Sequence, residues 1–186
     1  MRIVLLVAAV VGGLLTAGCD RQSDPQSQAA DKAGDATGRA AGPGVDKSQA
    51  GTAAPDVAFV DGDGEQTSLA AFRGKPLLLN LWATWCAPCV KELPTLDALA
   101  GQPGAPQVLA LSQDMQPQPT VAAFLDERKV GLETYQDKEM AMSSALGVQI
   151  LPTTILYGSD GKEIWRYSGD LDWTGPEAAE LLKQAR

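Results

Sequence analysis

The stretch LLNLWATWCAPCVKELPTL, residues 78–96, places two cysteines at the junction of two different patterns. Residues 75–83 form a continuous apolar run of strand length, which indicates a buried central strand. Residues 87–100 then carry apolar side chains at helical spacing, namely Val90, Leu93, Leu96, Leu99 and Ala100. We therefore expect the cysteines, Cys86 and Cys89, at the start of a helix that follows a buried strand.

Two cysteines separated by two residues can bind a metal, crosslink the fold or carry out redox chemistry. A structural zinc site needs four ligands, commonly two such pairs or added histidines, and the chain has one pair and no histidine. A structural disulfide that closes so short a loop removes little entropy from the unfolded chain. A redox pair fits best, because a helix N-terminus favours a thiolate at Cys86 and Cys89 can resolve a mixed disulfide.

The composition argues against other classes of function. The 186 residues have a formal net charge of −8, from 15 basic and 23 acidic side chains, and no basic stripe marks a nucleic-acid binder. The absence of histidine removes every Ser/His and Cys/His catalytic pair. We predict no metal site, no cofactor and no nucleic-acid partner.

The rest of the chain predicts an α/β domain over residues 55–186. A hairpin over 56–69 and a helical turn over 69–74 precede the strand at 75–83 and the helix at 87–100. A buried strand at 106–114, a helix at 118–130, a brief strand at 132–136 and a helix at 138–148 follow. A hairpin over 152–168 and a helix over 174–186 end the chain. Buried strands joined by crossover helices are typical of an α/β sandwich.

The motifs WATWCAPC (82–89), KELP (91–94) and LPTT (151–154) resemble the TlpA/ResA-type thiol–disulfide oxidoreductases of bacterial envelopes. The resemblance implies a thioredoxin fold, with a central mixed sheet flanked by helices, an N-terminal β-hairpin and a βα insertion. It also implies that Cys86 is the attacking thiol, that Cys89 is the resolving thiol, and that Leu151-Pro152 is a cis-proline turn against the disulfide.

The acidic residue near the cysteine pair stands at a different position in this chain than in thioredoxin itself. Thioredoxin has a buried aspartate six residues before the first cysteine, where this chain has Asn80. The TlpA/ResA type has a glutamate three residues after the second cysteine, and Glu92 matches. We expect Glu92 to relay the proton of Cys89, the alternative being a solvated glutamate on the helix surface.

Substrate contacts are predicted around the cysteines. Trp85 is expected to flank the sulfur and to shield it or meet substrate, although packing alone is an alternative. Ala87, Pro88, Leu151 and Pro152 complete the predicted substrate-binding set. A backbone extended at the cis-proline turn can pair with a substrate strand.

The direction of electron flow is read from the residues between the cysteines. Ala87-Pro88 is close to the Gly-Pro of thioredoxin, whereas strong oxidants of the DsbA type carry a histidine there. The two reference proteins differ by roughly 150 mV. We therefore predict a reductase of protein disulfides, which receives its electrons from a membrane donor of the DsbD/CcdA type. The maturation of cytochrome c or of an oxidase is the candidate process that it serves. The alternatives are a disulfide oxidase or isomerase and a copper-site thiol metallochaperone.

The N-terminal region predicts secretion and lipidation. Arg2 precedes an apolar run over 3–15 that is too short to span a bilayer but suits a signal peptide, here 1–18. LTAGC, residues 15–19, resembles a lipoprotein lipobox, so Cys19 is the expected lipid attachment site. Residues 19–54, with almost no large apolar side chains, are expected to form a flexible tether. We expect a lipid anchor on the periplasmic side of the bacterial inner membrane.

Overall fold

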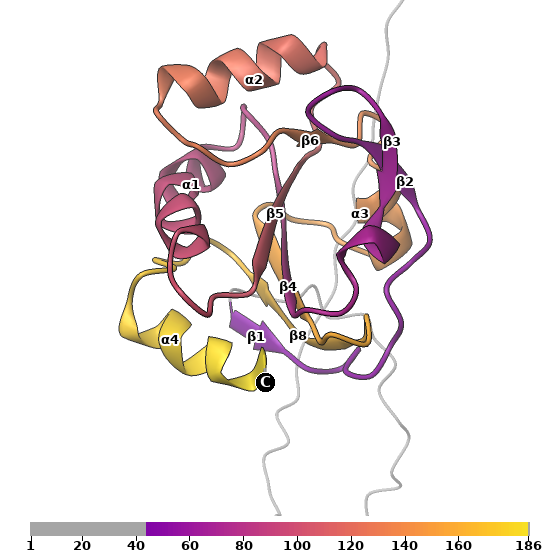
Figure 1. Ribbon diagram of the computed structural model, residues 1–186, viewed down its shortest axis with the longest axis vertical. Helices are drawn as coiled ribbons and strands as arrows, with labels where there is room; N and C mark the ends of the chain where they lie inside the picture. The colour runs from indigo at the N-terminus through magenta and orange to yellow at the C-terminus, as the bar shows by residue number, and fades with distance from the viewer. Residues whose placement is uncertain (1–43, 186) are drawn as a thin grey trace, which may run out of the picture. The chain divides into compact units, whose positions relative to one another are not determined.

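The computed structural model describes residues 44–185 (Figure 1). The predicted signal peptide, Cys19 and the first part of the predicted tether lie outside the described residues. Within the described range the strands are β1 (Gly44–Asp46), β2 (Ala58–Val60), β3 (Gln66–Ser68), β4 (Leu77–Trp82), β5 (Gln107–Ser112), β6 (Tyr135–Gln136), β7 (Thr153–Tyr157) and β8 (Glu163–Ser168). The helices are η1 (Leu69–Phe72), α1 (Ala87–Ala100), α2 (Gln118–Glu127), α3 (Ala141–Leu146), α4 (Pro176–Leu182) and η2 (Lys183–Ala185).

The strands form one mixed sheet in the order β1-β8-β7-β4-β5-β6-β2-β3. Strands β4, β5 and β6 are parallel neighbours, and every other pairing in the sheet is antiparallel. The carboxyl ends of β4, β5 and β6 therefore meet at one edge of the sheet, together with the start of antiparallel β7. This edge carries the cysteines. The fold confirms the predicted α/β class and mixed central sheet.

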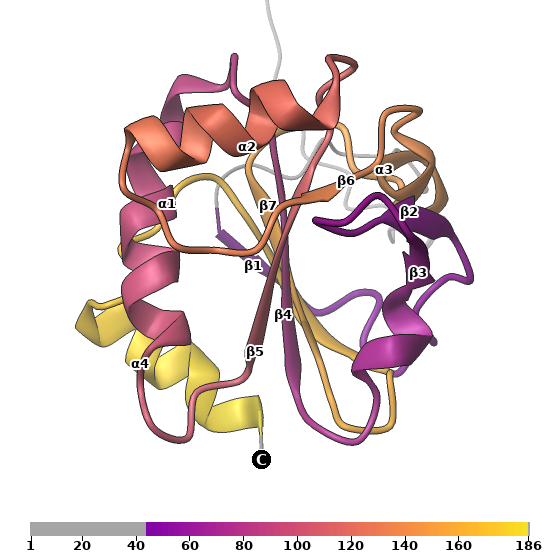
Figure 2. The same cartoon turned by 45° about the horizontal axis from the view of Figure 1, so that its top comes forward.

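Two apolar cores lie on opposite faces of the sheet, and Figure 2 shows the helices divided between them. Side chains alternate between the faces of a strand, and β4 is buried on both. Leu78 and Trp82 pack with α1, α2 and α4, whereas Leu79 and Leu81 pack with η1 and α3. Asn80 shares the register of Leu78 and Trp82, so its side chain points toward α1.

The predicted tether ends earlier than residue 54. Residues 44–46 form β1, whose Val45 lies opposite Tyr167 of β8, and Ala53 forms a bridge with Lys162. The Gly51 N–H also donates to the Glu163 carbonyl at 2.7 Å. The prediction of a flexible chain is therefore wrong for 44–54. An edge strand is held by main-chain hydrogen bonds, which need no large apolar side chains.

Helix α1 has the predicted bounds and a different buried face. Its buried residues are Cys89, Glu92, Leu93, Leu96 and Leu99, whereas Ala100 is exposed. Ala100, one of the apolar residues at helical spacing, therefore does not lie on the buried face, whereas the ionisable side chain of Glu92 does. None of the helices within 44–185 has the length and apolar content needed to cross a bilayer.

Candidate active site

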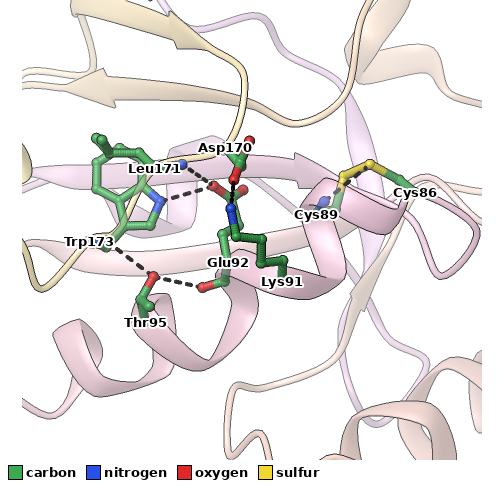
Figure 3. Close-up of polar contacts among 8 residues, drawn as sticks. All are labelled: Cys86, Cys89, Lys91, Glu92, Thr95, Asp170, Leu171 and Trp173. Carbon is green, nitrogen blue, oxygen red and sulfur yellow. Dashed lines mark hydrogen bonds and ion pairs between the residues drawn. A yellow bond between two sulfur atoms is a disulfide. The ribbon is translucent and has the colours of Figure 1, made fainter.

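The two cysteines form a disulfide at the N-terminus of α1 (Figure 3). The S–S distance is 2.04 Å, and Cys86 is the N-cap residue of the helix. The Cys89 N–H donates to Cys86 Sγ at 3.3 Å. Cys86 is 6% exposed and Cys89 is 0% exposed, so of the two residues only Cys86 retains any contact with solvent. Once the disulfide is reduced, the same N–H and the helix dipole favour a thiolate at Cys86.

Glu92 lies one turn along α1 from the disulfide and is 2% exposed, so the alternative of a solvated surface glutamate is wrong. One carboxylate oxygen accepts the amide of Asn80 at 2.7 Å. The other accepts the Leu171 N–H at 3.1 Å and the Trp173 indole N–H at 3.3 Å. Asn80 also donates to Thr154 Oγ1 at 2.9 Å, which ties the carboxylate to the strand after the proline turn.

Burial raises the pKa of Glu92 from 4.5 to about 7, and the nearby charge of Asp170 adds to the rise. The hydrogen bonds from Asn80, Leu171 and Trp173 favour the carboxylate and limit the shift. A carboxyl group with a pKa near 7 exchanges its proton close to neutral pH. Such a group, one turn along α1 from Cys89, can therefore serve as an acid or a base.

The Leu151-Pro152 peptide bond is cis, as the sequence predicts. Leu151 is half-buried, packing against both cores, and Pro152 is buried. Ala87 and Pro88, between the two cysteines in sequence, are exposed. Trp85 is 68% exposed, which rules out the alternative of a tryptophan explained by packing alone.

Known proteins are similar to this chain in sequence and in fold. The family model described as Redoxin matches residues 49–182. The chain belongs to the redoxin family. The thiol-disulfide oxidoreductase ResA of Halalkalibacterium halodurans is 30% identical to this redoxin over 139 residues, which are 73% of this chain and 78% of the relative. The ResA of Bacillus thuringiensis subsp. konkukian is 31% identical over 141 residues, 75% of this chain and 80% of the relative.

A solved structure agrees with the fold. The pneumococcal exposed lipoprotein thioredoxin (Etrx1) of Streptococcus pneumoniae superposes with a TM-score of 0.61 at 23% identity, covering 70% of this chain and 99% of that chain. The fold, the disulfide and the ResA relatives make this redoxin a ResA-type thiol–disulfide oxidoreductase. The relatives also support its assignment as a protein-disulfide reductase.

Sequence reasoning missed two residues of this redoxin's site. The Trp173 indole N–H donates to Glu92, but the two residues are 81 positions apart in the sequence and no local pattern connects them. Asp114 is 1% exposed and accepts two hydrogen bonds from Thr84, two residues before Cys86. A signal for Asp114 exists, because it is an acidic residue at the carboxyl end of the buried strand predicted over 106–114.

Within residues 44–185, no three Cys, Asp, Glu or His side chains lie together in a way that could hold a metal ion.

Proposed function

We propose that this redoxin reduces disulfides of other proteins in the bacterial envelope. The observation that carries the proposal is the Cys86–Cys89 disulfide at the start of α1, in which only Cys86 retains any exposure. The known activity named for its relatives, thiol–disulfide exchange, needs this difference in exposure between the two cysteines.

The reaction proceeds by two exchanges of sulfur bonds. The Cys86 thiolate attacks one sulfur of the substrate disulfide, a mixed S–S bond forms, and the other substrate sulfur leaves as a thiolate. The Cys89 thiol then loses its proton to a base and attacks Cys86 Sγ, which forms the Cys86–Cys89 disulfide and releases the second substrate thiolate. The substrate gains two electrons and leaves as two thiolates; one takes the proton released by Cys89 and the other takes a proton from water. Glu92, one turn from Cys89, is the proposed base.

The protein must be reduced again after each turnover. Two electrons have to come from another dithiol, and the proposed donor is a membrane electron relay of the DsbD/CcdA type. The proposed substrates are disulfide-containing envelope proteins, with apocytochrome c or the copper-site cysteines of an oxidase as specific candidates.

The direction of electron flow is tested by the reduction potential of the cysteine pair. Ala87-Pro88 lies between the cysteines and no histidine favours the thiolate, so we expect a potential nearer that of thioredoxin, about −270 mV, than that of DsbA, about −120 mV. Thiol trapping after equilibration in buffers of graded redox poise measures it. A potential close to that of DsbA would make this protein an oxidant.

The proposed location is the periplasmic side of the inner membrane, with a lipid on Cys19. The support is the lipobox-like sequence LTAGC followed by Asp20. We expect Cys19→Ser to move the protein from the membrane fraction to the soluble envelope fraction, because one residue provides the anchor. Cys89→Ser is the matched control and should stay with the membrane. Retention of Cys19→Ser in the membrane would mean a different anchor.

A further inference from the structure

Asp114 joins the ends of three neighbouring strands at the edge that carries the disulfide. Its two carboxylate oxygens accept the Thr84 N–H at 2.9 Å and the Thr84 hydroxyl at 2.6 Å, and so reach the end of β4. The Ser112 hydroxyl at the end of β5 donates at 2.8 Å. The Gln136 amide at the end of β6 donates to the Asp114 carbonyl at 2.7 Å.

These bonds fix the turn that leads into Cys86. The Cys86 N–H donates to the Ala83 carbonyl at 3.1 Å, which closes a tight turn over residues 83–86. Both donors of Thr84, the second residue of that turn, are taken by Asp114. Trp85 is therefore held between two fixed neighbours, and the start of α1 is fastened to the adjacent strand β5.

The carboxylate is retained at this place despite its burial. Asp114 is 1% exposed, and no Lys or Arg of residues 44–185 forms an ion pair with it. Burying an unpaired charge is costly unless hydrogen bonds compensate for the lost water, and three donors do so here. Both carboxylate oxygens are used to hold Thr84, so the contacts of this side chain point to the turn before Cys86.

We propose that Asp114 is a positioning residue for disulfide exchange, which acts through Thr84 to hold the turn before Cys86. Attack of one sulfur on a disulfide requires the three sulfur atoms to lie nearly in line. A turn that adopts several conformations holds Cys86 in this geometry for less of the time, which lowers the rate. The same turn keeps Cys86 Sγ against the Cys89 N–H, which favours the thiolate. This inference rests on the proposed function, because the rate it concerns is that of disulfide reduction.

The test removes one hydrogen bond without changing the shape of the side chain. Thr84→Val keeps the backbone N–H donor and loses the hydroxyl donor to Asp114, whereas Thr84→Ser keeps both. We expect Thr84→Val to lower kcat/KM for insulin disulfide reduction about tenfold. We also expect slower iodoacetamide alkylation of Cys86 in a chain that lacks Cys19 and Cys89, with the alkylation profile displaced to higher pH. Thr84→Ser should restore both readouts to within about twofold of wild type.

Ser48 provides a matched control on the far edge of the sheet. Its N–H and hydroxyl donate to the two oxygens of Asp46 at 2.7 Å and 2.9 Å, the same pattern as the pair of Thr84 and Asp114. Ser48→Ala should leave the reduction rate and the alkylation profile unchanged. Urea unfolding of all variants separates a loss of stability from a loss of rate.

The outcomes separate this inference from the proposed function. A Thr84→Val protein that is less stable but keeps the wild-type rate and alkylation profile overturns the positioning role and leaves Asp114 as a structural residue. A wild-type protein that does not reduce insulin disulfides overturns the proposed function instead. The alkylation comparison still decides the role of Asp114 in that case, because it needs no substrate.

Discussion

Replacing Cys86 with alanine is expected to abolish disulfide reduction, with a loss of at least about a thousandfold relative to wild type. Of the two cysteine residues only Cys86 has any exposure, 6% against 0% for Cys89. Its Sγ also receives the N–H at the start of α1, which favours the nucleophilic thiolate. Insulin reduction with a dithiol donor measures the rate, and circular dichroism confirms that the variant is folded.

Cys89→Ala is the informative partner variant. It should complete the first exchange and stop there, because the buried sulfur that resolves the mixed disulfide is gone. We expect covalent complexes between Cys86 and substrate proteins, which separate on non-reducing gels and disappear with dithiothreitol. In reduced wild-type protein Cys86 should be alkylated before Cys89. Equal alkylation of the two thiols near neutral pH would contradict the assigned roles.

The elements around the cysteines could be predicted because each has a local pattern. The unbroken apolar run at 75–83 predicts β4, and the helical spacing of leucines predicts α1 with its observed bounds. The cis-proline turn follows from the LPTT motif through the family resemblance. These features depend on neighbours in sequence or on a short motif, which a single chain displays directly.

Other features depend on partners far along the chain. Strand β1 is held by backbone bonds to β8, about 120 residues later, and its composition resembles that of a linker. The burial of Glu92 depends on Leu171 and Trp173, which follow β8. The helical pattern of α1 alone marks Glu92 as a polar position, and only the tertiary contacts show that it faces inward.

The consequences of that burial can be measured with Glu92→Gln. In the wild-type protein, one carboxylate oxygen of Glu92 accepts a hydrogen bond from the Asn80 amide, and the other accepts from the Leu171 and Trp173 N–H groups. The glutamine carbonyl can accept the latter two. Its NH₂ group then faces Asn80, whose Oδ1 has no partner within residues 44–185 and can accept it once the amide turns. We therefore expect the variant to fold.

The stability of the wild-type protein should fall as pH rises. Below about pH 4.5 Glu92 is protonated in both the folded and the unfolded chain, so folding buries a neutral carboxyl group. Between pH 4.5 and about 7 the unfolded chain loses this proton while the folded chain keeps it, so the unfolding free energy decreases by up to about 3 kcal/mol. Glu92→Gln should lack this decrease, whereas Glu177→Gln, the same change on the exposed surface of α4, should retain it.

The rate of disulfide reduction should also depend on the ionisation of Glu92, but it should rise with pH whereas the stability falls. A base must be ionised to take the Cys89 proton, so the wild-type rate should rise with pH through about 7, the pKa of Glu92. Glu92→Gln should lack this rise and should react about tenfold more slowly near pH 8, where the wild-type carboxylate is ionised. Glu177→Gln should follow the wild-type curve. An unchanged pH–rate profile in Glu92→Gln, together with the expected change in stability, would show that Glu92 titrates in the folded protein without taking part in the reaction.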